Sequence, residues 1–273
     1  MDLTPIAMKS PAALLALVAL TAGCTTVPET GRRQLMLVSA SEEAGMGLEA
    51  FAQIKKTEKQ SQDVETNARI QRIGRRIAQS VGRDLPNAQW EFVVFESEQL
   101  NAFALPGGKV GVYTGLIRLT ESDDQLAAVI GHEIAHVSSR HGAERTSQNL
   151  AVTGVGLLAG IGMEAKDVDP AKRNAILAAY GVGTTVGLML PYSRLHETEA
   201  DSIGLRFAAG AGYDPRAAAE FWRRMAAANK GGARPPEFLS THPAEEARIK
   251  NLEEIAPRFM PLYESARTKF DQP

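Results

Sequence analysis

Apolar residues recur at helical spacing over residues 41–59 and 63–82. In the second segment, branched apolar residues three or four positions apart share one helical face: Ile70, Ile73, Ile77 and Val81. A break at 84–87 ends this pattern. The first third of the chain therefore predicts two helices.

Extended segments come next. Residues 90–95 predict a strand, and 101–105 and 109–114 predict two extended pieces around a tight turn at 106–108. Because Pro106 and the glycines of that turn stop a ladder from continuing, 101–105 is expected to lie at the edge of a sheet. The alternative is a plain β-hairpin.

Helical patterns dominate the remainder. Ser122 and Gln125 have capping-box spacing and begin a helix that is expected to run through the 130s. Two glycine-rich apolar stretches, 150–163 and 175–190, flank a charged segment. They predict a helical hairpin that covers the active site as a lid, with ordinary core or a membrane-contacting surface as alternatives. Further helices are expected near Tyr192, after 214–215 and after 241–243, which gives an α+β chain.

Composition narrows the class of protein. The 273 residues carry 30 basic and 32 acidic side chains, a formal charge of −2, and 6% aromatic residues. This is not the basic footprint of a nucleic-acid-binding protein. A single cysteine excludes an internal disulfide framework and a zinc site built from several thiolates.

The lone cysteine, Cys24, follows an apolar run over 11–22 that is too short to span a bilayer but is typical of a signal peptide. Small residues before it resemble a bacterial lipobox, although Thr21 departs from the usual leucine. We therefore expect a signal peptide over 1–23, lipidation at Cys24 and, since Thr25 is not aspartate, an outer-membrane lipoprotein. The alternatives are an ordinary secreted signal and an N-terminal anchor helix.

Metal chemistry is indicated by His132-Glu133-Ile134-Ala135-His136 within the helix that begins at Ser122. Histidines four apart share one helical face, so both imidazoles can reach one cation, while Glu133 lies close enough to take a proton from water. A chance pair is improbable, because the whole chain has five histidines.

A third protein ligand is needed for a catalytic zinc site. The extension of this motif by a glycine and a third histidine fails here, because Ser139 and Gly142 occupy those positions. Glu197 and Asp201 are better candidates, being four residues apart on one helical face. We expect Glu197 to be an oxygen ligand and Asp201 to accept from a ligating imidazole.

Together these residues resemble peptidase family M48, which includes the CAAX prenyl proteases, the HtpX proteases and the Oma-type mitochondrial protease. The resemblance extends to 101–108, to Ser240-Thr241-His242-Pro243 and to Arg248, and covers residues 65 to 256. It implies a zincin-like (gluzincin) α+β fold. The predicted organisation is a linker over 24–40, the metallopeptidase domain over 41–260 and a C-terminal tail over 261–273.

The resemblance also implies roles. One Zn²⁺ per chain would be held by His132, His136 and Glu197, with Glu133 as general base. His242 would stabilise the oxyanion or, alternatively, sit on zinc and restrain activity. Arg248 would pair with Asp201 or the glutamate ligand. His141 and His196 are expected to be structural.

Substrate would bind to the predicted edge strand, whose residues Asn101, Ala102, Phe103 and Ala104 would pair with an extended peptide. The leading hypothesis is a zinc endopeptidase at the periplasmic face of the outer membrane, acting on misfolded or misassembled envelope proteins. The alternatives are a chaperone-like lipoprotein that holds extended clients, and a zinc hydrolase acting on another bond.

Overall fold

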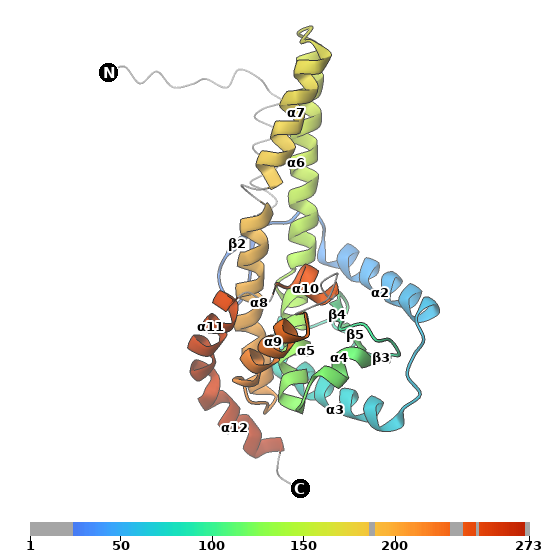
Figure 1. Ribbon diagram of the computed structural model, residues 1–273, viewed down its shortest axis with the longest axis vertical. Helices are drawn as coiled ribbons and strands as arrows, with labels where there is room; N and C mark the ends of the chain where they lie inside the picture. Colours follow the sequence, from blue (N-terminus) through green and yellow to red (C-terminus); the bar gives the residue numbers. More distant parts are fainter. Residues whose placement is uncertain (1–23, 186–188, 230–236, 244–245, 271–273) are drawn as a thin grey trace, which may run out of the picture.

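Helices dominate the structure, and a small sheet lies beside them (Figure 1). The computed structural model describes residues 24–185, 189–229, 237–243 and 246–270. The elements follow in this order: β1 (Cys24–Thr26), β2 (Arg33–Leu35), α2 (Ala40–Thr57), α3 (Val64–Val81), β3 (Glu91–Phe95), β4 (Ala102–Leu105), β5 (Lys109–Tyr113), α4 (Thr114–Leu119), α5 (Asp123–Ser138), α6 (His141–Glu164), α7 (Pro170–Thr184), α8 (Leu190–Gly210), α9 (Ala217–Ala228), α10 (Glu237–Thr241), α11 (Glu246–Ile255) and α12 (Met260–Phe270). The α+β prediction is confirmed. The predicted signal peptide lies outside the described residues.

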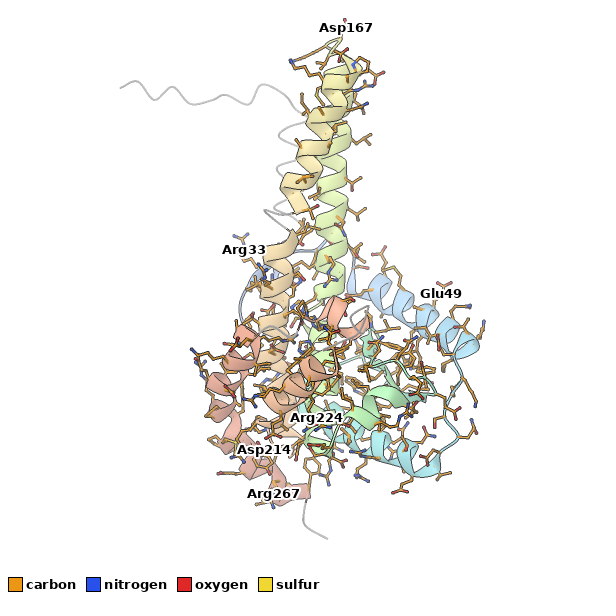
Figure 2. All side chains as sticks on the ribbon, in the orientation of Figure 1. Arg33, Glu49, Asp167, Asp214, Arg224 and Arg267 are labelled. Atoms are coloured by element: carbon orange, nitrogen blue, oxygen red, sulfur yellow. The ribbon has the colours of Figure 1, made fainter. Side chains whose placement is uncertain are left out.

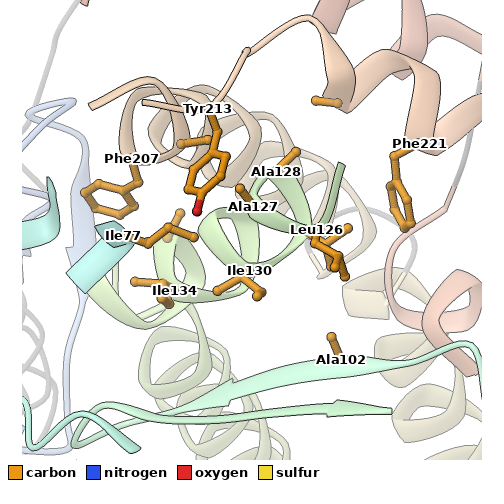
Figure 3. Close-up of a cluster of buried hydrophobic side chains, with 14 of the residues drawn as sticks. Ile77, Ala102, Leu126, Ala127, Ala128, Ile130, Ile134, Phe207, Tyr213 and Phe221 are labelled. Atoms are coloured by element: carbon orange, nitrogen blue, oxygen red, sulfur yellow. The ribbon is translucent and has the colours of Figure 1, made fainter. Parts of the chain in front are cut away.

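Helix α5 is the centre of the core. Its predicted cap is present, since the Ser122 hydroxyl accepts from the Gln125 N–H at 3.2 Å. Leu126, Ile130 and Ile134 are fully buried, and α3, α8, α9 and β4 all pack around the helix (Figure 3). Residues 125–135 of the helix are all buried, which suits this position because each face meets another element.

Helices α5 and α8 touch at the level of the backbone. A Cβ on Gly131 would lie 2.8 Å from the carbonyl oxygen of Gly204, and a Cβ on Gly204 would lie 2.8 Å from both Cα and N of His132. Glycine is therefore required at the crossing, since any larger residue would push the helices apart. This contact brings the predicted ligands of α5 and α8 together.

The sheet has the strand order β3-β5-β4. β3 runs parallel to β5, and β4 pairs antiparallel with β5 through contacts such as Ala102 opposite Val112. Gly107 and Gly108 form the turn between β4 and β5 with φ of +89° and +84°, values that favour glycine. β4 therefore lies at the edge of the sheet, as predicted, and it packs against α5.

Two expectations about the ends of the domain are wrong. The predicted linker over 24–40 contains an antiparallel pair, β1 with β2, because Val27, Gln34 and Met36 are buried against the body. Within the predicted tail, residues 261–270 form most of α12, which packs on α8 and places the Phe270 ring 4.6 Å from the Arg76 guanidinium. Contacts distant in sequence order both segments.

The predicted helical hairpin is confirmed as α6 and α7, which lie side by side and project beyond the body (Figure 1), with Asp167 at the tip (Figure 2). It is not core, because Leu157 and Leu158 are 65% and 68% exposed. Among the described residues, none of the helices has a stretch both long enough and apolar enough to span a bilayer.

Substitution of Gly204 by alanine should separate α5 from α8. We expect Gly204→Ala to lower the free energy of unfolding by about 1–3 kcal/mol, the usual cost of overpacking, measured by urea denaturation. Gly154→Ala is the control, because a Cβ there meets no atom within 4 Å. It should be neutral, or stabilising by up to about 1 kcal/mol through helix propensity. Equal stability of the two variants would contradict the assigned role of the crossing.

Candidate active site

Four predicted side chains converge from three parts of the fold. His132 and His136 come from α5, Glu197 from α8, and His242 directly follows α10; one ligand atom of each lies within 4.8 Å of all the others. The Nε2 atoms of His132 and His136 are 3.0 Å apart. Glu197 Oε2 is 3.4 Å from His132 Nε2, and Glu197 Oε1 is 3.3 Å from His136 Nε2.

These separations fit one tetrahedral metal ion. Ligand atoms bound to zinc at about 2.0–2.1 Å are about 3.3 Å from each other. His242 Nδ1 extends the set, at 3.3 Å from His132 Nε2 and 3.0 Å from Glu197 Oε2. The donors are imidazole and carboxylate, which zinc prefers. The four residues could therefore hold a single Zn²⁺ ion.

His132 is oriented from behind by a buried ion pair. Its Nδ1 lies 3.0 Å from Asp201 Oδ1, and Asp201 accepts two further bonds from the Arg248 guanidinium at 2.7 and 2.8 Å. Burial alone would lower the pKa of His132, but the bonds to Asp201 and Glu197 raise it to about 9. With Nδ1–H donating to Asp201, Nε2 is the nitrogen left for a metal.

Arg248 has a fixed position within this group. Its guanidinium lies 3.7 Å from the centre of the Trp222 ring and 3.0 Å from Glu197 Oε2. It therefore contacts both the predicted ligand and the aspartate behind the other ligand. Both pairings expected for Arg248 from sequence are present.

Glu133 lies on the opposite side of the cluster. Its Oε1 is buried and has no hydrogen-bond partner among the described residues, and His242 Nε2 is 3.6 Å away. Burial raises the pKa of Glu133. A carboxylate that is easily protonated and faces open space is suited to accept and release a proton.

That space is a cleft of about 440 Å³. One wall is β4 with its flanking residues, from Asn101 to Pro106, and the other carries Glu133, His136 and His242. From the hairpin, residues of the first two turns of α6 line the cleft, namely His141, Gly142 and Arg145. Most of α6 and α7 stands away from it, so the expected lid is wrong.

Behind His136 lies a second buried network that the sequence did not predict. His136 Nδ1 is 2.8 Å from His141 Nδ1, and His141 Nε2 is 2.9 Å from Glu199 Oε2. Burial lowers the pKa of His141 to about 4, so the ring is neutral. Glu199 stays ionised despite burial, because bonds from His141, Arg32 and Thr30 lower its pKa to about 2.

Arg32 joins this network from β1–β2. It makes two bonds to Glu144, at 2.7 and 2.9 Å, and one from Nε to Glu199 at 3.0 Å. Glu144 also meets His196 Nε2 at 2.9 Å, and the His196 ring stacks on His141 with centroids 4.2 Å apart. His141 and His196 are thus outside the four-residue cluster, as expected, but His141 touches one of its members.

Sequence spacing gave a partial signal for this network. Glu199 lies roughly 200° around the helix from Glu197, so helical spacing places it on the other side of α8 from the predicted ligand. His141 fits no ligand spacing. Arg32 is 112 and 167 positions from Glu144 and Glu199, a separation that no local pattern reports.

Comparison with known proteins agrees with this geometry. The model of peptidase family M48 matches residues 64–256. The mitochondrial metalloendopeptidase OMA1 of Schizosaccharomyces pombe is 35% identical over 85% of this chain and 66% of its own length. The beta-barrel assembly-enhancing protease of Escherichia coli is 30% identical over 87% of this chain and 48% of its own length.

A third relative, the mitochondrial metalloendopeptidase OMA1 of Arabidopsis thaliana, is 39% identical over 62% of this chain and 32% of its own length. The chain therefore spans 32% to 66% of the length of these curated relatives.

Removal of the carboxylate behind His132 should weaken metal binding. We expect Asp201→Asn to raise the Kd for Zn²⁺ about 10- to 100-fold, the usual effect of losing such a partner, measured by competition with a chromophoric chelator. Asp214→Asn is the control, since Asp214 pairs with Arg216 on the surface. An Asp201→Asn protein with unchanged Zn²⁺ affinity would show that this carboxylate does not orient the ligand.

Proposed function

Because this chain belongs to peptidase family M48, a family of zinc metalloendopeptidases, we propose that it cleaves extended segments of unfolded proteins, with His132, His136 and Glu197 holding zinc and Glu133 moving the proton. The observation that supports this most is the cleft itself. One side carries Glu133 Oε1, which has no hydrogen-bond partner in the described part of the chain, beside the four-residue cluster, and the other is an edge strand.

Substrate would bind by strand addition to β4. In the described part of the chain, β4 pairs with β5 on one side. Residues from Asn101 to Ala104 line the same cleft as Glu133. Main-chain hydrogen bonds to such an edge do not read side chains. Substrates would therefore be selected by their ability to become extended rather than by sequence.

Zinc supplies Lewis acidity, which polarises a peptide carbonyl and lowers the pKa of water. Glu133 takes the proton of the attacking water at its carboxylate and delivers it to the nitrogen of the departing amine. Its raised pKa suits both halves of this transfer. Asp201 keeps His132 in place during the reaction through its contact with His132 Nδ1, and Arg248 in turn holds Asp201.

His242 would restrain the enzyme. Its Nδ1 lies in the ligand cluster, at distances comparable with those between the other three ligands. A catalytic zinc site keeps one position open for water or substrate, whereas a site closed by four protein ligands does not. We therefore favour the restraining role of His242 over the oxyanion-stabilising one, and cleavage requires its imidazole to leave.

The substrates would be misfolded or misassembled proteins of the bacterial cell envelope. Two features support this: the lipobox-like residues before Cys24, which predict lipidation and a place at the periplasmic face of the outer membrane, and the similarity to a protease named for β-barrel assembly. The two OMA1 relatives described above are named as mitochondrial, so the family supports the chemistry more directly than the location.

Replacement of Glu133 by glutamine tests the chemistry. We expect Glu133→Gln to lower kcat for unfolded casein at least about 10²-fold, since general acid–base catalysis contributes about 10²- to 10⁴-fold. Zn²⁺ content should be unchanged, and a chelator should abolish cleavage by the wild type. Binding of casein without cleavage by either protein would instead favour a chaperone-like function.

Replacement of His242 by alanine tests the restraint. We expect His242→Ala to cleave casein several times faster than the wild type, because the fourth position becomes available. Zn²⁺ should still bind through the other three ligands. A kcat that falls at unchanged Zn²⁺ content would contradict restraint and support a role for His242 in stabilising the oxyanion.

A further inference from the structure

We propose that Glu199, held by Arg32, positions the metal ligand His136 through His141 by fixing which ring nitrogen of each histidine carries the proton. This inference rests on the proposed function, since it takes His136 to be a zinc ligand. It adds three positioning residues that the ligand motif does not contain.

The argument begins at Glu199. Arg32 Nε and Nη2 both meet its Oε2, at 3.0 and 2.9 Å, and Thr30 donates to Oε1. A carboxylate held in this way can only accept hydrogen bonds. The 2.9 Å contact between His141 Nε2 and Glu199 Oε2 therefore requires the proton to be on His141 Nε2.

The positions of the remaining protons, on His141 and His136, follow from the chemistry of imidazole. A neutral ring with a proton on Nε2 has an acceptor at Nδ1. The 2.8 Å contact between the two Nδ1 atoms then requires His136 to donate from its Nδ1. The lone pair of His136 is consequently on Nε2, the atom that lies 3.0 Å from His132 Nε2 in the ligand cluster.

The two histidine ligands thus have parallel supports. Asp201 with Arg248 acts directly on His132, while Glu199 with Arg32 acts on His136 through one intervening ring. Arg32 and Thr30 lie before residue 64, where the family match begins. The β1–β2 segment, residues 24–35, is therefore part of the support of the metal site.

The test compares two buried glutamates that share Arg32. Glu199→Gln lets the side-chain amide donate to His141 Nε2. His141 can then carry its proton on Nδ1 and donate to His136 Nδ1, which leaves the proton of His136 on Nε2. Glu144→Gln removes an equally buried charge from the same arginine, but Glu144 bonds to His196 rather than to His141. Both are measured by chelator competition for Zn²⁺ and by ¹⁵N NMR of histidine-labelled, metal-free protein.

We expect Glu199→Gln to raise the Kd for Zn²⁺ about 10- to 100-fold and to shift the His136 signals toward the Nε2–H tautomer. Glu144→Gln should change the Kd less than about threefold and leave the tautomer of His136 unchanged. Equal losses in the two variants, or unchanged Zn²⁺ binding in Glu199→Gln, would overturn the proposal.

Two further variants separate failure of the proposal from a folding defect in Glu199→Gln and from a wrong assignment of His136 as a ligand. If Glu199→Gln does not fold, Arg32→Lys retains the charge but loses the planar fork, and it should weaken Zn²⁺ binding several-fold; unchanged binding would overturn the proposal. His136→Ala tests the ligand assignment itself. Full Zn²⁺ affinity in that variant would contradict the proposed function itself, and not only the positioning role of Glu199 and His141.

Discussion

The backbone contact between α5 and α8 is the constraint on which the site depends. Gly131 and Gly204 allow the two helices to meet without intervening side chains. Glu197 precedes Gly204 by seven residues, so both lie on nearly the same face of α8. The face that touches α5 therefore also presents the Glu197 carboxylate to His132, which follows Gly131, and to His136 one turn further on. A wider separation of the helices would move Glu197 out of reach of His132 and His136.

The buried carboxylates around the four-residue cluster are paired with arginines. Buried carboxylates are costly unless they are paired and hydrogen-bonded, and here two arginines supply the partners. Arg248 joins Asp201 to Glu197 on one side. Arg32 joins Glu144 to Glu199 on the other. Each group keeps a nearby imidazole in one orientation, so the same contacts that make burial of the acids tolerable also shape the metal site.

The residues around the four-residue cluster form two groups, those that border the cleft and those that hold the histidines in place. Glu133, His242 and the edge strand β4 border the cleft. Asp201 and Arg248 support His132, and His141, which also lines the cleft, joins His136 to Glu199. The hairpin of α6 and α7 contributes its base to the cleft and extends its exposed apolar residues elsewhere (Figure 2). The residues of the hairpin that line the cleft therefore belong to its base.

Much of this protein could be predicted from local patterns. The helical register of His132, Glu133 and His136, the four-residue spacing of Glu197 and Asp201, the cap at Ser122 and the turn at Gly107 and Gly108 are short-range features, and the sequence alone determined them. Arg32, Glu199 and His141 form a network only after folding, and so do the ordering of residues 24–35 and the packing of α12. Tertiary structure decided these because their partners are up to 194 positions apart, as in Arg76 and Phe270, and local sequence patterns do not report which distant groups will be buried together.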